Sequence, residues 1–187
     1  MCPPFNRFFA PHRRRRRLWI LAATTVLTGV ATGYFALEME KHGVGILEFE
    51  FTRTAADAER HYGDLGSDGR TDAMWSLLLD YPYLVSYGLL LIGAAIAVGE
   101  RSLRARRPAL AGLAPWIAWG ALGAATFDAV ENTALLLVLD GNTGQPWPAI
   151  AYGCAMAKFV LIAAALLYIA GGLLLALRRP RPVSRAT

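Results

Sequence analysis

Four long apolar stretches, separated by polar segments, dominate the hydrophobic pattern of the chain. They cover about 18–37, 76–98, 110–139 and 149–177. The first has twenty residues without a charge, and as a helix it spans roughly 30 Å, the thickness of the hydrocarbon core. The last two are longer and have room to tilt or to extend beyond the bilayer. The pattern predicts an all-α fold, a transmembrane four-helix bundle over 18–177, with a basic N-terminal segment over 1–17 and a basic tail over 178–187.

The polar segment 38–75 is predicted to be a mostly irregular outer loop with some local order. Between 47 and 52 apolar residues alternate with polar ones, which predicts a short strand or extended edge. Thr54 is a typical N-cap, and the residues after it predict a short helix that ends near 61–62. Three glycines then interrupt the chain: Gly63, Gly66 and Gly69. Thr71 is the predicted N-cap of the second span.

Composition supports a membrane protein and excludes several soluble classes. Hydrophobic residues make up 55% of the chain and charged residues 18%, against about 25% charged residues in an average soluble domain. The net charge of +5 comes from arginines in short blocks, without the interleaved aromatic residues of a nucleic-acid groove. Cys2 and Cys154 lack the spacing of metal ligands. Phosphate-binding loops, nucleophile elbows and dinucleotide fingerprints are missing from the sequence, which argues against the soluble enzyme classes that use them. From the arginine distribution, the cysteine spacing and these missing motifs together, we predict no nucleic-acid partner, no cofactor and no metal.

The distribution of basic residues predicts the orientation in the membrane. Arginines are concentrated in three segments, 7–17, 99–109 and 178–185, whereas 38–75 has four basic residues against nine acidic ones. By the positive-inside rule the basic segments lie on the cytoplasmic side, so both termini are predicted to be cytoplasmic in a cell inner (plasma) membrane. The tryptophans agree, because indole prefers the headgroup level. Trp19, Trp116 and Trp119 fall at the predicted inner ends, and Trp75 and Trp147 at the outer ends.

A secretory signal is the alternative interpretation of the first span. The arginines at 13–17 precede an apolar run, and the triplet 31–33 resembles a weak cleavage site. The arginine pair also matches the start of a twin-arginine signal. We favour a retained span, because the apolar run continues through Tyr34, Phe35 and Leu37 to full spanning length.

Ionisable residues inside the predicted spans are the strongest functional signal, because each costs about 2.5–3.5 kcal/mol to insert. Asp80 lies in the second span, Asp128 and Glu131 in the third, and Lys158 in the fourth. At the helical rise, Asp128 lies roughly 16 Å, Glu131 roughly 12 Å and Lys158 roughly 14 Å below the outer ends, and Asp80 lies about one turn below. We therefore expect all four to meet in the outer half of the bundle.

Further polar residues share helical faces with these four. Asn132 lies on the face of Asp128 and Glu131, and Tyr83 and Tyr87 follow Asp80 beyond Pro82, where a kink is allowed. The predicted ligand-binding set is Asp80, Tyr83, Tyr87, Asp128, Glu131, Asn132, Tyr152 and Lys158. Three acids against one base leave an uncompensated negative charge, which calls for a protonated carboxyl, a bound cationic group or water.

Structural roles are the alternative for the same residues. In this interpretation Asp128 and Lys158 form an interhelical lock, Asp80 lies at the headgroup level, and Asn132 hydrogen-bonds between spans. Gly29 and Gly33 indicate close helix packing. A metal site is a further alternative for three residues of the outer loop, which are otherwise solvated. These are Glu38, His42 and His61.

Two short motifs carry a resemblance. The stretch Leu-Asp-Tyr-Pro-Tyr at 79–83, followed by Tyr87, and the stretch Asp-Ala-Val-Glu-Asn at 128–132 resemble motifs in a group of small bacterial four-span membrane proteins whose activity is uncharacterised. The resemblance covers about 51–139. It implies a four-span membrane fold with a short helix and a glycine-bearing turn before the second span, and it implies no activity.

Three functions are compatible with these features. The first is binding of a lipid or amphiphile in a polar intramembrane pocket, where Asp128 or Glu131 is the candidate general acid if the protein is an enzyme. The second is a non-catalytic membrane scaffold or assembly partner that uses the acidic outer loop. The third is a cation- or proton-coupled carrier that titrates the same carboxylates, although the chain lacks the broken inverted repeats typical of carriers. The sequence favours them in that order and leaves open catalysis and the formation of a homo-oligomer.

Overall fold

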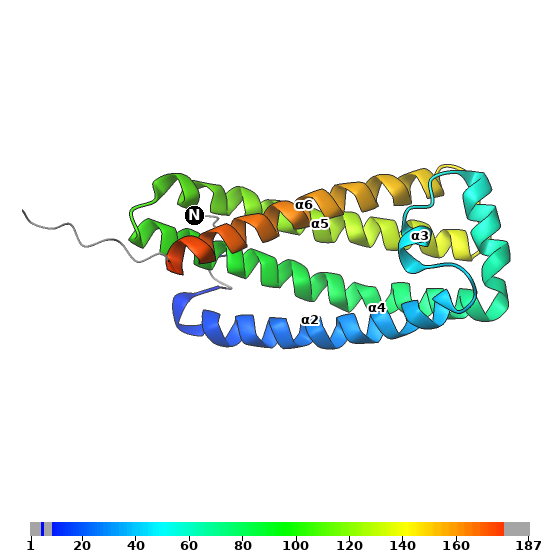
Figure 1. Ribbon diagram of the computed structural model, residues 1–187, viewed down its shortest axis with the longest axis horizontal. Coiled ribbons are helices and arrows are strands. Elements are labelled where there is room, and N and C mark those ends of the chain that lie inside the picture. Colours follow the sequence, from blue (N-terminus) through cyan, green and yellow to red (C-terminus); the bar gives the residue numbers. More distant parts are fainter. Residues whose placement is uncertain (1–4, 6–8, 178–187) are drawn as a thin grey trace, which may run out of the picture.

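The computed structural model describes residue 5 and residues 9–177. All regular elements in this part of the chain are helices, labelled as in Figure 1. The four long helices are α2 (Pro11–Glu40), α4 (Ala55–Arg104), α5 (Pro108–Leu139) and α6 (Trp147–Leu177), and the short one is α3 (Ile46–Glu50). Each long helix contains one predicted span and is long and apolar enough to cross a membrane. The predicted all-α bundle is confirmed, the chain is a multi-pass membrane protein, and the predicted basic tail lies outside the described residues.

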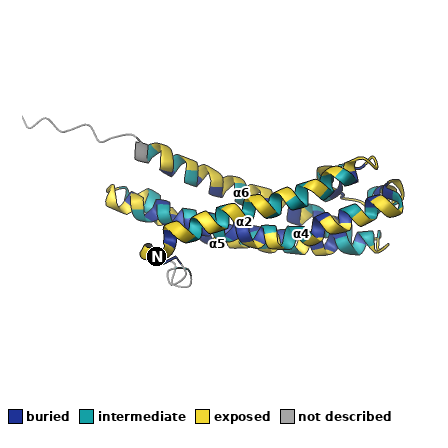
Figure 2. Cartoon of the chain, turned by 90° about the horizontal axis from the view of Figure 1, so that it is seen from below, coloured by how far each residue is buried: buried dark blue, intermediate teal, exposed yellow. Residues whose placement is uncertain are grey.

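The long helices pack in the order in which they occur in the chain. α2 packs on α4, α4 on α5 and α5 on α6, and α6 also contacts α4. α2 lies at the edge of the bundle, and its exposed apolar residues include Val26, Leu27 and Val30. Figure 2 shows the exposed residues along α2 and α6 and the buried ones along α4 and α5. The exposed apolar faces are those that a bilayer would solvate.

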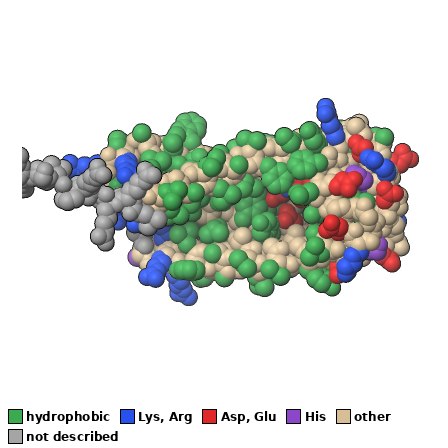
Figure 3. Space-filling view, in the orientation of Figure 1, with side chains coloured by type: hydrophobic (Ala, Val, Ile, Leu, Met, Phe, Trp, Pro, Cys, Tyr) green, Lys and Arg blue, Asp and Glu red, His purple; other side chains and the backbone are tan. Residues whose placement is uncertain are grey.

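The two ends of the bundle differ in charge. We call the end where α2 begins and α4 meets α5 the basic end, and the end that carries 41–72 and 140–146 the acidic end. Figure 3 shows lysine and arginine side chains at the basic end and most acidic side chains at the opposite one. The exposed tryptophans Trp19, Trp116 and Trp119 lie on the basic side of their helices and Trp75 on the acidic side.

The acidic end is more ordered than the sequence predicts. The prediction of a strand between 47 and 52 is wrong, because Ile46–Glu50 forms the helix α3. Thr54 is the N-cap of α4 as predicted, and its Oγ1 accepts a hydrogen bond from the Asp57 backbone N–H at 3.1 Å. The predicted helix end near 61–62 and the new cap at Thr71 are wrong. α4 continues to Arg104, and its one non-helical residue is Gly66.

Gly66 changes the direction of α4. Its φ of 59° lies in the left-handed region, which costs glycine little and other residues much more. Figure 1 shows the part of α4 before this residue crossing the acidic end of the bundle, and the part after it running along the bundle. The segment 55–65 therefore covers the acidic end of the bundle next to α3.

Small residues let the spans approach closely. A Cβ atom added at Gly99 of α4 would lie 2.5 Å from the Cβ of Ala114 on α5, and one added at Gly172 of α6 would clash with Val98. Membrane helices commonly pack through such residues. In the predicted glycine pair, Gly29 contacts the ring of Tyr83 at 3.0 Å by the same measure, whereas Gly33 faces open space.

Two apolar core clusters flank a polar layer along the bundle axis. The first, near the acidic end, includes Phe49, Leu77 and Leu135. The second, toward the basic end, includes Ile92 and Ala121. Asp80, Asp128, Glu131 and Lys158 fall between these clusters on their respective helices.

Candidate functional site: a carboxylate cluster around Lys158

Lys158 lies at the centre of the polar layer. Its Nζ donates to Asp128 Oδ1 at 2.8 Å and to Glu131 Oε1 at 2.9 Å, and these two acids come from α5. All three residues are buried, with 5% exposure for Lys158, 3% for Asp128 and 0% for Glu131. Lys158 is eleven residues from the start of α6 at Trp147, which places it roughly 16 Å along the helix from that end. The predicted meeting of Lys158 with the acids of the third span is therefore present in the structure.

α4 adds further polar residues to the cluster. Tyr87 donates its hydroxyl to Asp128 Oδ2 at 2.8 Å, so both oxygens of Asp128 are hydrogen-bonded. Asn132 donates its Nδ2 to Asp80 Oδ2 at 2.7 Å. The ring of Tyr83 lies 5.3 Å from that of Tyr87 between centroids. These contacts bring the predicted residues of the second and third spans together.

Glu50 is a member of the cluster that the sequence analysis missed. Its Oε1 lies 3.6 Å from Lys158 Nζ, and its side chain is 16% exposed. Burial raises the pKa of Glu50 above its ordinary value, and the charge of Lys158 opposes the rise. The sequence pattern places Glu50 in a short strand or extended edge of the outer loop. Its neighbour Glu48 has the same chemistry in the same apolar surroundings of the sequence, so no local signal separates the two.

The cluster has more acid than base. We define it as Glu50, Asp80, Asp128, Glu131 and Lys158, four carboxyls and one amine, so the surplus is one acid larger than the sequence predicts. Glu131 Oε2 is buried and has no hydrogen-bond partner among the described residues. A buried polar atom without a partner costs about 1–3 kcal/mol. The arrangement therefore leaves an acceptor ready to receive a donor in a low-dielectric site.

α3 covers the acidic side of the cluster. Phe49 is fully buried in the core cluster of the acidic end. The ring of Phe51 stacks on Phe159 at 5.8 Å and contacts Tyr152 edge-on at 6.2 Å. Tyr152, a predicted site residue, thus lies beside α3, where Arg53 also contacts its ring. Figure 1 shows α3 between the α5–α6 pair and the α2–α4 pair at this end.

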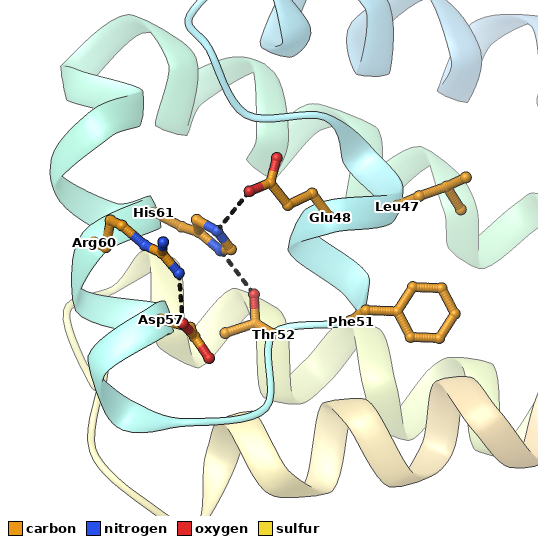
Figure 4. Close-up of a pocket in the computed structure, with 7 residues that line it drawn as sticks. All are labelled: Leu47, Glu48, Phe51, Thr52, Asp57, Arg60 and His61. Carbon is orange, nitrogen blue, oxygen red and sulfur yellow. Dashed lines mark hydrogen bonds and ion pairs between the residues drawn. The ribbon is translucent and has the colours of Figure 1, made fainter.

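A histidine holds the segment after α3. His61 of α4 is buried, and its Nδ1 lies 2.9 Å from Thr52 Oγ1 while its Nε2 lies 3.3 Å from Glu48 Oε1. These residues line a cavity of about 340 Å³. Figure 4 shows His61 between Glu48 and Thr52, and Leu47 and Phe51 pointing away from it. Both ring nitrogens of His61 have protein partners, which indicates that His61 fastens α3 to α4.

The structure does not bring the three candidate metal ligands together. Glu38 pairs with Lys41 at 2.6 Å, His42 with Asp72 at 3.5 Å, and His61 is engaged as described. Among the described residues no group of three or more histidine, cysteine, aspartate or glutamate side chains is placed to hold a metal ion.

A second, partly buried charge contact lies at the basic end. Arg14 donates to both oxygens of Glu100, at 2.8 and 2.6 Å, and its Nε donates to the carbonyl of Phe9 at 3.1 Å. Phe9 itself is 1% exposed and packs into the core cluster toward this end. In the sequence, Arg14 is part of a basic run in which no residue is distinguished from its neighbours.

The chain matches no protein-family model, and comparison with curated proteins and with solved structures finds no similar protein. The resemblance of its motifs to small bacterial four-span proteins stays a prediction.

Proposed function

We propose that this membrane protein binds the polar head of a lipid or other amphiphile in the cluster around Lys158. The observation that carries the proposal is Glu131 Oε2, a carboxylate oxygen that is buried inside the cluster and has no partner in the described part of the chain. Polar groups in the hydrocarbon region are expensive and mark ligand or ion pathways. A ligand head that donates a hydrogen bond to this oxygen would remove the cost of leaving it unpaired.

The surroundings of the cluster suit an amphiphile. Acidic side-chain atoms are visible within the apolar midsection of the face in Figure 3. Beside the cluster, Phe51 is 37% and Phe159 38% exposed, and Val160 on α6 is 64% exposed. A polar group next to an exposed apolar and aromatic strip matches a ligand with a hydrogen-bonding head and an apolar tail.

The scaffold and carrier hypotheses predict different behaviour of the same residues. A scaffold that uses the acidic end would tolerate neutralisation of Glu131, because the partner would contact 41–72. A carrier would show flux that depends on Glu131 in proteoliposomes. A binding site requires a ligand that stays with the protein and depends on the cluster.

Native mass spectrometry of protein released from detergent tests the proposal. Wild type, Glu131→Gln and the control Glu59→Gln are compared after extraction from the same membranes. Glu59 is exposed and lies in the part of α4 that covers the acidic end. We expect one additional mass in wild type and in the control and its loss in Glu131→Gln. An equal ligand mass in all three proteins, or three ligand-free spectra, would contradict the proposal.

The orientation is part of the same proposal. Because arginines gather at the basic end, we propose that this end and both termini are cytoplasmic and that the cluster lies in the outer half of the bilayer. In a protein whose own Cys2 and Cys154 are replaced by serine, Asn142→Cys and Ala105→Cys place single thiols in the α5–α6 and α4–α5 loops. In intact cells a membrane-impermeant maleimide should label the first and leave the second unlabelled until lysis. The reverse pattern would contradict this orientation.

A further inference from the structure

The free positions of the cluster define which head group fits. Lys158 already occupies one oxygen each of Asp128 and Glu131, and Tyr87 occupies the second oxygen of Asp128. The buried cluster atom that has no hydrogen-bond partner among the described residues, Glu131 Oε2, is a carboxylate oxygen and accepts when Glu131 is ionised. With Glu131 ionised, a ligand atom that matches this oxygen is a donor, so a head that carries only acceptors does not fit.

The charge of the cluster further limits the class of head group that would bind. With all groups ionised, the four carboxylates exceed the single ammonium by three charges, and Glu50 contributes through its 3.6 Å contact with Lys158. Like charges repel strongly at low dielectric. An anionic head would add to the surplus, a neutral head would leave it unchanged, and a cationic head would reduce it.

Aromatic rings around the cluster also favour a cationic head group. Lys158 Nζ itself lies 5.2 Å from the ring centroid of Phe159. The rings of Tyr83 and Tyr87 contact each other on the α4 side. Aromatic faces beside carboxylates are a common way to bind ammonium groups.

We propose that the ligand is an amphiphile with a protonated amine head, which donates to Glu131 Oε2 and partly neutralises the carboxylate cluster while its tail lies along Phe51 and Phe159. This inference rests on the proposed function and names the class of ligand for the same site. Two observations carry it independently of the acid count: the unpaired, fully buried oxygen of Glu131 and the aromatic lining beside Lys158.

Three probes with one chain length and different heads test the inference. Tetradecylamine, tetradecanol and myristate are titrated separately into the full-length protein in a neutral detergent, and bound probe is measured by native mass spectrometry. We expect tetradecylamine to bind at least about tenfold more tightly than tetradecanol, as one charge-assisted hydrogen bond implies. Myristate should bind most weakly, because its carboxylate meets the acidic cluster.

Variants show whether binding occurs at the cluster. Glu131→Gln should weaken tetradecylamine about tenfold, since the amide keeps the shape and removes the charge. Glu50→Gln provides a second test outside the spans, so the inference does not depend on one variant folding. Its matched control is Glu48→Gln on the same short helix, because Glu48 faces His61 and its side chain is 60% exposed. Glu50→Gln should weaken the amine, and Glu48→Gln should leave it unchanged.

The outcomes separate this inference from the proposed function. Binding of tetradecanol or myristate that equals or exceeds that of tetradecylamine and is lost in Glu131→Gln would overturn the ammonium head and retain an amphiphile site. Binding of all three probes that is insensitive to Glu131→Gln and to Glu50→Gln would overturn both. Amine binding that is equally weakened by Glu48→Gln and Glu50→Gln would overturn the assignment of the head to the cluster.

Discussion

The two sites where charged side chains of different helices meet differ in how their charges are paired. At the basic end, the Arg14 guanidinium meets Glu100 through two parallel hydrogen bonds, and the third nitrogen of Arg14 binds a backbone carbonyl. Near the acidic end, one ammonium contacts several carboxyls, and one oxygen of Glu131 has no partner among the residues that the structure describes. In a bidentate pair the guanidinium and the carboxylate satisfy each other's hydrogen-bonding groups. The cluster near the acidic end has more carboxyls than its one ammonium can pair, and this excess is the basis of the proposed ligand site.

The largest expected effect comes from removing the cation of the cluster around Lys158. Lys158→Met leaves buried carboxylates without compensation and should lower the free energy of unfolding by about 3–5 kcal/mol. Lys158→Arg keeps the charge and should lower it less. Both are measured by denaturant unfolding in the same detergent. A Lys158→Met protein as stable as wild type would show that the carboxyls are held neutral without Lys158.

The Arg14–Glu100 pair should respond differently to paired substitution. Arg14 and Glu100 have side chains that are 10% and 18% exposed, so each single change, Arg14→Met or Glu100→Met, should cost only about 1–2 kcal/mol. The double variant should recover part of this loss, because no charge stays buried and unpaired. A double-mutant cycle measures the recovery. Strictly additive losses would show that the interaction between Arg14 and Glu100 does not stabilise the packing at the basic end.

A packing change near the Arg14–Glu100 pair should leave ligand binding at the cluster around Lys158 unchanged. Gly99 precedes Glu100, and a Cβ atom there meets Ala114 at 2.5 Å, so Gly99→Ala should destabilise the protein by about 1–3 kcal/mol. Gly33 faces open space, so Gly33→Ala is the control and should cost nothing. Neither should change the co-purifying ligand in native mass spectra. Loss of ligand in Gly99→Ala would mean that the two sites are coupled along α4.

The smallest effect is a pH dependence of opposite sign for two acids of the segment between α2 and the bundle part of α4. Thr54 donates its hydroxyl to Asp57, which lowers the pKa of Asp57 below 3.8. Asp57 therefore stabilises the fold above about pH 4, and the contribution is lost as the pH falls. Burial raises the pKa of Glu50 above 4.5, so its contribution is full below that pH and is lost as the pH rises.

Unfolding midpoints across pH check both signs. The stability difference between wild type and Asp57→Asn should disappear in acid. Glu50→Gln should gain on wild type as the pH rises through the raised pKa of Glu50. If the stability differences of Asp57→Asn and Glu50→Gln changed with pH in the same direction, the contrast between the hydrogen-bonded carboxylate of Asp57 and the buried carboxyl of Glu50 would be wrong.

The spans and the core of the site follow from the sequence for physical reasons. A run of about twenty apolar residues has few alternatives to a membrane helix, and the cost of buried charge requires Asp128, Glu131 and Lys158 to meet. The acidic end does not follow in the same way. Alternation over 47–52 fits a strand as well as one turn of an amphipathic helix. The inward position of Glu50 depends on long-range contacts with α6, and the selection of Arg14 from a run of five arginines depends on where Glu100 ends up on α4.

The stability of Glu131→Gln tests the central claim, that the surplus carboxylate is kept for binding rather than for folding. The free energy of unfolding is measured in ligand-free detergent beside wild type and Lys158→Met. The amide of Gln keeps an oxygen that accepts from Lys158 Nζ, and the change removes one buried negative charge of the acid-rich cluster. The protein should therefore be as stable as wild type or about 1 kcal/mol more stable, although the ligand is lost. A loss of several kcal/mol, comparable with that of Lys158→Met, would show that the fold needs the negative charge of Glu131 and would contradict the account.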